Sequence, residues 1–322
     1  MFCTTRARII PSLFERLPFM QPLSVLFPLV FVALIGFICA RFNLFSNEHF
    51  VGLRQFFFNL AIPTLLFISM YQADLSRVLS ATVMISFYGP VLTVYILCTS
   101  LLKIIKKTPL ADSAIFALGC TYSNTVLVGL PIIITSLGAQ YGALVFIIIT
   151  FHSAMLFALT FFCATEHKNN LVKLLKPLFI NPIVLSISCG LLANLLNIAL
   201  PQPVQSALLL LAEPAIAGAL FVLGASLVNY SIKHAWQPAL LISLIKLIIL
   251  PLAVYVTARW GFKLDTTLIS VVTLMSASPL GVNAYLVTRQ LNTQQAVMAS
   301  SVALSTLLSI VTLSLWLTAL VP

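Results

Sequence analysis

Residues 119–131 read GCTYSNTVLVGLP, and residues 276–283 read SASPLGVN. Each stretch lies inside a long apolar segment and combines proline with glycine and small polar residues. Proline removes a backbone hydrogen-bond donor and clashes with the preceding helical turn. Ser, Thr and Asn side chains can satisfy the backbone groups that such a break sets free. The sequence therefore predicts two hydrophobic helices that are interrupted in their middle.

The rest of the chain is as apolar as these two segments. Of its 322 residues, 61% are hydrophobic and only 7% are charged, whereas soluble domains carry roughly 25% charged residues. Apolar runs near 20 residues recur, the length needed to cross a bilayer core of about 30 Å. We predict an all-α membrane protein with ten transmembrane helices, at residues 23–40, 55–72, 80–102, 111–137, 142–164, 181–199, 205–228, 238–258, 266–289 and 295–320.

The net charge of +10 is explained by the membrane and not by nucleic acid, because most basic residues lie between apolar runs. The odd-numbered loops hold nine Lys and Arg residues, against six on the other side and three if the chain starts at Met20. Basic loops stay in the cytoplasm, so we predict cytoplasmic odd-numbered loops and both termini outside. Residues 1–20 are interpreted as an N-terminal extension.

The two halves of the chain repeat a pattern of prolines. Pro28 is followed eight residues later by Gly36, and Pro182 is followed eight residues later by Gly190. Further matched pairs are Pro63 with Pro214, Pro90 with Pro251, and Pro131 with Pro279. A repeat of five spans is odd-numbered, so its second copy must be inverted in the membrane. We predict one repeat at residues 21–165, a cytoplasmic linker at 166–179 and a second repeat at 180–322, an arrangement typical of secondary transporters.

The interrupted helices are the predicted substrate site. Asn124 and Pro279 each lie 13 residues into their span, about 20 Å deep at 1.5 Å per residue. Half-helix N-termini at that depth would present free N–H groups and partial positive charge to an anion. The alternative is a pair of proline kinks buried between helices. The candidate substrate-binding residues are Ser123, Asn124, Gly129, Pro131, Ser278, Pro279, Gly281 and Asn283.

Three ionisable residues lie within the predicted spans, where they are functional candidates by default. Lys246 is interpreted either as an attractor of anionic substrate or as a lysine that snorkels to the interface. Glu213 is either a protonatable coupling group or a neutral hydrogen-bonded acid. His152 either carries a proton or hydrogen-bonds a neighbouring helix.

The motifs resemble those of a known family of membrane transporters. Residues 123–131 are similar to the fourth-span motif of the auxin efflux carrier family, and residues 279–283 with 290–292 resemble its ninth-span motif. Residues 212–214 and 223–227 resemble its seventh span. The resemblance implies ten helices in two inverted repeats, with broken helices four and nine crossing in a mobile transport domain and spans one, two, six and seven in a scaffold. It also implies a bacterial-type carrier of mono- or dicarboxylates such as malate and malonate.

These observations favour a secondary transporter that moves a small organic anion across the bacterial inner membrane by alternating access. An anion channel and a transporter-derived sensor remain the alternatives. The sequence has no HExxH motif and no pair of aspartates within a span, so it does not indicate an enzyme. We expect no cofactor, no metal and no nucleic-acid partner. The expected partners are the small organic anion and the lipid bilayer, and a homodimer is an open alternative.

The predicted topology can be tested by thiol labelling. A cysteine introduced between Lys168 and Lys176 is expected to be shielded from impermeant thiol reagents in intact cells, because this basic loop should be cytoplasmic. Labelling should appear only after the membrane is permeabilised. Labelling of intact cells would reverse the orientation.

Overall fold

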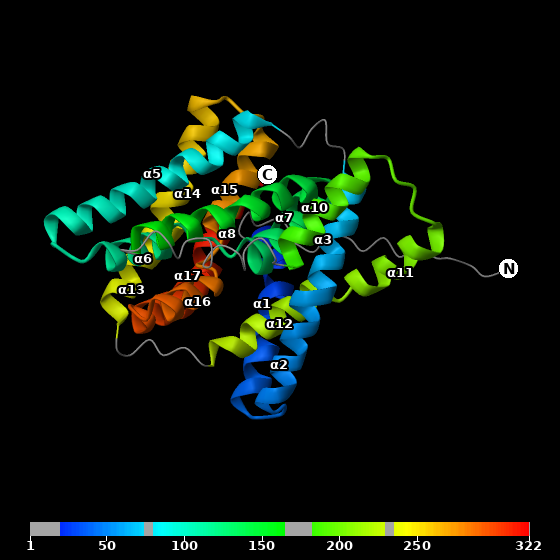
Figure 1. Ribbon diagram of the computed structural model, residues 1–322, viewed down its shortest axis with the longest axis horizontal. Coiled ribbons are helices and arrows are strands. Elements are labelled where there is room, and N and C mark those ends of the chain that lie inside the picture. The colour runs from blue at the N-terminus through cyan, green and yellow to red at the C-terminus, as the bar shows by residue number, and fades with distance from the viewer. Residues whose placement is uncertain (1–19, 74–79, 165–181, 229–234, 322) are drawn as a thin grey trace.

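The computed structural model describes residues 20–73, 80–164, 182–228 and 235–321. The described part is helical throughout and contains no strand, in agreement with the predicted all-α class (Figure 1). Six of its helices are long and apolar enough to cross a membrane, and five shorter helices are also apolar. The predicted N-terminal extension, apart from Met20, and the predicted linker at 166–179 lie outside the described residues.

Within the described residues, the first half of the chain contains nine helical elements and a short 3₁₀ turn. They are α1 (Met20–Arg41), α2 (Asn47–Phe56), the π-helix η2 (Phe57–Ala61), α3 (Ile62–Tyr71), α5 (Ala81–Ile105), α6 (Leu110–Thr121), the π-helix η3 (Thr125–Gly129), α7 (Leu130–Leu137), the 3₁₀ turn η4 (Ala139–Tyr141) and α8 (Gly142–Ala164). The segments α2, η2 and α3 are continuous with one another, as are η3 and α7.

The second half begins, within the described residues, at α10 (Pro182–Leu195). It continues with α11 (Gln202–Ala212), α12 (Ala215–Leu227), α13 (Trp236–Leu244), the π-helix η6 (Ile245–Ile249), α14 (Leu250–Val256), the π-helix η7 (Thr257–Gly261), α15 (Thr266–Ala277), α16 (Asn283–Leu291) and α17 (Gln295–Leu320). The helix from α13 to η7 is continuous.

These elements follow the predicted spans with two notable differences in their ends. The second span begins at Asn47 and not at residue 55, because the side chain of Ser46 accepts a hydrogen bond from the N–H of His49 and caps the helix early. The sixth span ends at Leu195, four residues before the predicted end at 199. The arrangement of ten spans as an inverted repeat stays a prediction.

The helices pack in neighbouring pairs that join distant parts of the sequence. Helix α1 packs against α12, and α3 packs against α10 and α11. Among the other helices, α5 packs against α6, α6 against α8, α13 against α17, and α14 against α15. In Figure 1, α5, α6 and α13 lie on one side of the molecule, and α3, α10 and α11 lie on the other.

Glycine allows two of these helix pairs to approach closely. A Cβ atom at Gly224 in α12 would lie 1.7 Å from the carbonyl oxygen of Ala33, and one at Gly36 in α1 would lie 2.0 Å from that of Phe221. The contact between α1 and α12 is therefore reciprocal. In the second pair, a Cβ at Gly190 in α10 would lie 2.5 Å from the carbonyl oxygen of Phe67 in α3. Small residues at such positions are typical of helix contacts in membranes.

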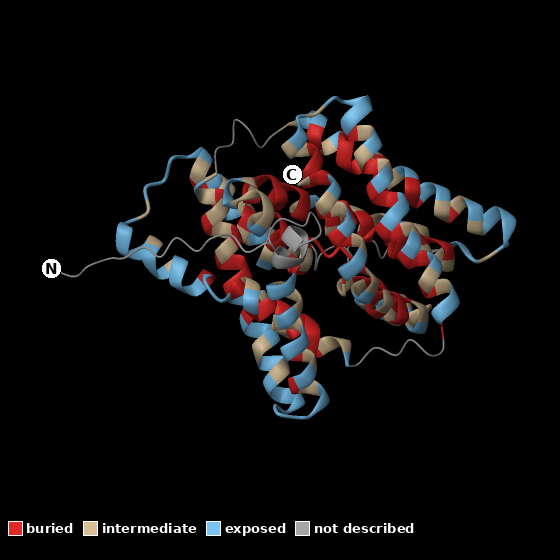
Figure 2. Ribbon diagram, turned by 180° about the vertical axis from the view of Figure 1, so that it is seen from behind, coloured by how far each residue is buried: buried red, intermediate tan, exposed pale blue. Residues whose placement is uncertain are grey.

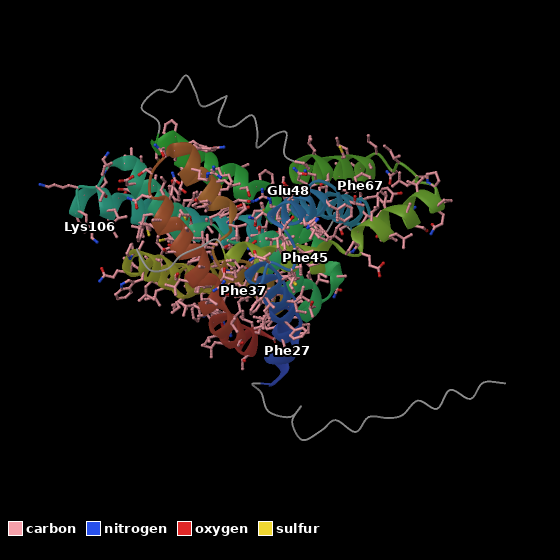
Figure 3. All side chains as sticks on the ribbon, turned by 90° about the horizontal axis from the view of Figure 1, so that it is seen from below. Phe27, Phe37, Phe45, Glu48, Phe67 and Lys106 are labelled. Atoms are coloured by element: carbon pink, nitrogen blue, oxygen red, sulfur yellow. The ribbon has the colours of Figure 1, made fainter. Side chains whose placement is uncertain are left out.

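The buried residues gather in the centre of the molecule, and exposed residues cover its outer helices (Figure 2). Much of the outside is apolar: Phe27 on α1, for example, is 61% exposed. Lys106, by contrast, lies at the outer end of α5, away from the core (Figure 3). An apolar outer surface is the one that lipid tails solvate, as expected for a membrane protein.

An apolar cavity of about 420 Å³ lies between four helices. Helices α1 and α12 form one wall, and α7 and α17 form the other. Leu34, Leu220 and Leu313 are among its lining residues. Helices α1 and α12 thus pack closely against each other, whereas a cavity separates part of this pair from α17.

The glycine contacts predict which substitutions the fold does not tolerate. Gly224→Ala places a methyl group into the backbone of α1, so we expect the free energy of unfolding to fall by about 1–3 kcal/mol through overpacking. Gly89→Ala is the matched control, because no atom lies within 4 Å of the added Cβ. That variant should be neutral or slightly stabilising, since alanine favours helix more than glycine does.

Thermal unfolding of both variants in the same detergent would measure the difference. Equal melting temperatures for Gly224→Ala and Gly89→Ala would contradict the close approach of α1 and α12.

Candidate functional site

Two helices are interrupted near the centre of the chain's buried core, as the sequence predicts. Helix α6 ends at Thr121 and η3 begins at Thr125, so residues 122–124 lie outside any helix. Helix α15 ends at Ala277 and α16 begins at Asn283. The first break comes slightly earlier than expected, because residues 125–131 are already helical.

The two breaks are joined to each other by backbone hydrogen bonds. The N–H of Asn124 donates to the carbonyl of Pro279 at 2.7 Å, and the N–H of Gly281 donates to the carbonyl of Tyr122 at 3.2 Å. Between these bonds, Ser123 and Leu280 form an isolated antiparallel bridge. Each break therefore supplies acceptors for N–H groups that the other break has freed.

Side chains from two further helices satisfy the next backbone groups. The N–H of Ser123 donates to Nε2 of His152 in α8 at 2.8 Å. The N–H of Leu280 donates to Oγ of Ser305 in α17 at 3.1 Å. Unwound backbone is tolerated in a membrane only where protein or a water-filled cavity covers it, and these contacts supply that cover.

Asn124 has a double role at the first break. Its Oδ1 accepts a hydrogen bond from the N–H of Leu127 at 3.3 Å and so caps the following helix. Its Nδ2, however, has no partner among the described residues, although Asn124 is only 6% exposed. The hydroxyl oxygen of Ser123, which is 1% exposed, also lacks a partner in this part of the chain. Buried polar groups are nearly always hydrogen-bonded, so two adjacent unsatisfied groups indicate a place for a ligand or water.

A small pocket opens beside these groups. Its volume is about 40 Å³, room for roughly three water molecules or one carboxylate group at 10–15 Å³ per water. Its polar lining consists of Tyr122, Ser123, Asn124, Thr125, Ser153 and Asn283. Apolar residues close it from other elements: Phe58 of η2, Ile149 of α8 and Ile183 of α10.

The pocket lies at the N-terminal ends of two helices. One is the continuous segment of η3 and α7, which starts at Thr125, and the other is α16, which starts at Asn283. The first N–H groups of a helix have no acceptor within it, and a helix N-terminus carries roughly +0.5 elementary charge. Both helices thus direct partial positive charge into the pocket, and the described residues that line it include no acidic side chain.

The predicted substrate-binding residues fall into two groups. Ser123, Asn124, Gly281 and Asn283 line the pocket. Gly129, Pro131, Ser278 and Pro279 do not line it and support the breaks instead.

The geometry of the breaks is clear at two supporting positions, Gly129 and Ser278, and at Gly281, which both lines the pocket and supports the break. A Cβ at Gly281 would lie 2.4 Å from the ring of Tyr122, and one at Gly129 would lie 2.9 Å from Sδ of Met275. The hydroxyl of Ser278 donates to the carbonyl of Leu274 at 3.1 Å, which turns it away from the pocket. Glycine is therefore required where the broken segments meet.

Comparison with known proteins gives the family. The family model described as "Membrane transport protein" matches residues 23–317. The chain belongs to this family. It is the family that the fourth-, seventh- and ninth-span motifs resemble, that of the auxin efflux carriers, and its members are membrane transporters. The protein is therefore an integral membrane protein.

Two relatives in the curated collections are similar over most of this chain. A protein of Rhizobium meliloti (strain 1021) named "Putative malonate transporter" is 22% identical over 298 residues, which cover 90% of this chain and 93% of the relative. The "Lysosomal cholesterol signaling protein" of Mus musculus is 26% identical over 313 residues. These cover 89% of this chain but only 36% of the mouse protein.

Of the three ionisable candidates, His152 contacts the first break directly. Its ring is fully buried and stacks on Tyr122 with centroids 5.2 Å apart. Because Nε2 accepts the N–H of Ser123, the neutral ring must carry its proton on Nδ1. This contact supports the interpretation of His152 as a hydrogen-bond partner of a neighbouring helix.

The other two candidates differ from expectation. Lys246 is fully buried and donates to the carbonyl of Ser276, so the interpretation as a snorkelling lysine is wrong. Glu213 caps the C-terminal end of α11 and is exposed beside Pro214, and it does not line the pocket. Glu213 and Pro214 separate α11 from α12 within the predicted seventh span.

Four polar residues of the site were not singled out from the sequence: Tyr122, Thr125, Ser153 and Ser305. Tyr122 lies within the quoted motif, and its hydroxyl hydrogen-bonds Ser153 at 2.8 Å and also Asn283. Ser153 follows His152 directly, and that position is the only sequence signal for it. Ser305 lies in a serine-rich helix, where nothing in the sequence distinguishes it from its neighbours.

The contact between His152 and the break predicts a stability difference. His152→Phe keeps a ring but removes the acceptor, which leaves the buried N–H of Ser123 unpaired, so we expect a loss of about 1–3 kcal/mol. His152→Gln, which can place an oxygen near the position of Nε2, should lose less. Phe151→Leu, on the exposed side of the same helix, is the control and should change little.

Thermal unfolding in detergent would rank the three variants. A His152→Phe protein as stable as Phe151→Leu would show that the histidine does not support the break.

Proposed function

We propose that this protein is a secondary carrier that moves a small organic anion, a mono- or dicarboxylate, and holds one carboxylate group in the pocket between the breaks. The observation that carries the proposal is the pair of unsatisfied buried groups, Nδ2 of Asn124 and Oγ of Ser123, at the N-terminal ends of two half-helices. An amide N–H and a hydroxyl can both donate to a carboxylate.

The electrostatics of the pocket favour an anion over a cation. Helix N-termini attract negative charge, and the lining supplies neutral donors without a carboxylate. The printed name of the Rhizobium relative, which refers to malonate, supports a carboxylate as the class of substrate. We therefore select malonate as the first compound to test.

The packing of the helices supports a carrier that alternates between two states. In the proposed inverted repeat, span one corresponds to span six, and span two to span seven. The contact of Gly36 with α12 then corresponds to that of Gly190 with α3, since each glycine approaches a backbone carbonyl of the other half. We propose residues 21–165 and 180–322 as these repeats, and superposition of one on the other is the check.

The position of the pocket also suits such a mechanism. One side of it is formed by the two breaks, and the other by Phe58 and Ile183 from the second and sixth spans. Those spans belong to the scaffold that the family resemblance implies. Movement of the breaks against η2 and α10 would carry the bound carboxylate with them.

Several finer points belong to the same proposal. We place the protein in a bacterial inner membrane, with odd-numbered loops in the cytoplasm, both termini outside and a homodimer as an open alternative. Counterflow of labelled malonate in liposomes would distinguish a carrier from an anion channel, because a channel does not exchange substrate against a gradient. A sensor would bind the anion without moving it.

Asn124 is the residue on which to test the anion site. Asn124→Asp keeps the oxygen that caps Leu127 but replaces the free N–H donor by a negative charge. We expect malonate binding to weaken at least about tenfold, in line with the 1–3 kcal/mol lost when a buried polar partner is left unsatisfied. The fold should persist, because aspartate is as good a helix cap as asparagine.

Asn47→Asp is the matched control, because it makes the same chemical change at an exposed position in the first turn of α2. Binding would be measured by calorimetry on purified protein, and uptake in liposomes. Malonate affinity that is the same in Asn124→Asp and Asn47→Asp would place the substrate elsewhere.

A further inference from the structure

Lys246 is an unusual group in the core of this protein. It is the second residue of η6 and is 0% exposed, one of the largest side chains to be buried completely. Within the described residues, no ion pair joins it to a carboxylate, and its recorded hydrogen bond goes to the backbone carbonyl of Ser276. A buried charge without a partner is destabilising by several kcal/mol, so something in its surroundings must offset the ammonium.

The partner carbonyl belongs to the end of a broken helix. Ser276 is the penultimate residue of α15, which stops at Ala277. The last carbonyls of a helix have no donor within it, and the C-terminus carries roughly −0.5 elementary charge. Lys246 therefore supplies a donor and a positive charge where α15 has neither.

The other broken helix packs against the same turn. Helix α6, which stops at Thr121, contacts η6, the turn that carries Lys246. Among the described residues, no charged side chain pairs with Lys246, so the negative partial charge that faces the ammonium comes from the end of α15.

The broken region thus has two poles. The N-terminal ends of η3 and α16 border the pocket, and Lys246 is absent from its lining. The C-terminal end of α15 faces Lys246 instead, and α6 packs against the turn that carries this lysine. In carriers built on discontinuous helices, half-helix C-termini and unwound carbonyls are where a coupling sodium ion is held.

We infer that the Lys246 ammonium is a covalently held cation at the C-terminal end of α15, in the place of a dissociable sodium ion, so that carboxylate binding by this protein needs no sodium. The carboxylate in this inference is the substrate of the proposed function, so the inference rests on that proposal. Lys246 does not line the pocket and acts as a positioning residue, because it holds the end of the helix whose break forms one side of the pocket.

The first measurement uses the unmodified protein. Malonate binding by the purified protein should be the same in sodium chloride and in choline chloride of equal concentration. Malonate binding that requires sodium would overturn the inference, whatever any variant does.

The second measurement removes the held cation. Lys246→Met keeps the length of the side chain without its charge, and we expect malonate affinity to fall by about tenfold, within the range usual for coupled sites. Lys246→Ala leaves a space, which sodium or methylammonium should fill and so restore affinity. Lys106→Met, at the exposed end of α5, is the control. Its malonate affinity should equal that of the unmodified protein and should not change with sodium. A merely structural lysine would not give rescue by an added cation.

A third measurement needs no substrate and separates this inference from the proposed function. A ligand that binds only the folded state raises the melting temperature, so sodium or methylammonium should stabilise Lys246→Ala more than it stabilises the unmodified protein. If this holds but no carboxylate binds, the proposed function fails and the inference on the cation stands. If neither cation stabilises Lys246→Ala beyond the unmodified protein, or if Lys246→Met binds malonate normally, the inference fails.

Discussion

Every backbone N–H and C=O group inside a bilayer needs a partner, and the broken helices of this protein are built around that constraint. The breaks at 122–124 and 278–282 free donors and acceptors in the buried part of the protein. They partly satisfy each other through the bonds of Asn124 with Pro279 and of Gly281 with Tyr122. His152 and Ser305 supply the remaining acceptors, so each break depends on the other and on two neighbouring helices.

The two breaks also place the positive and negative ends of helices at different positions in the site. Because the two helices are cut at the same place, two N-termini and two C-termini come together there. The N-termini border a pocket with unsatisfied donors, and the C-terminus of α15 receives the ammonium of Lys246. In the described part of the chain, the proposed anion and cation locations both arise from helix ends and not from acidic side chains.

The sequence predicts the breaks because residues 119–131 and 276–283 combine proline and glycine with small polar residues. Proline alone does not interrupt a helix in this protein, since Pro28 and Pro90 lie inside the unbroken helices α1 and α5. Asn124 could likewise be identified, since asparagine beside a break either caps a helix or binds a ligand. The direction of each side chain could not be predicted: Ser123 faces the pocket, whereas Ser278 bonds back to its own helix.

Lys246 shows why the remainder of the site escaped prediction. Its depth follows from the sequence, but its direction depends on the rotation of its helix, and η6 is a π-helix that changes this rotation. Its partner is a carbonyl 30 positions away, and a carbonyl has no signature in the sequence. Ser305 presents the same difficulty, because α17 contains several serines and only tertiary packing selects the one that reaches Leu280.

The 420 Å³ cavity between the α1–α12 pair and α17 has a mechanical consequence. Atoms that border a void have no dispersion contacts on that side, so few such contacts would be lost if one wall were displaced along the other. The reciprocal glycine contacts within α1–α12 are the opposite case, because no sliding is compatible with backbones that already touch. Sliding of α1 against α12 would therefore disturb more contacts than displacement of the α1–α12 pair relative to α17. The cavity marks the helix contact in this molecule that resists relative movement less.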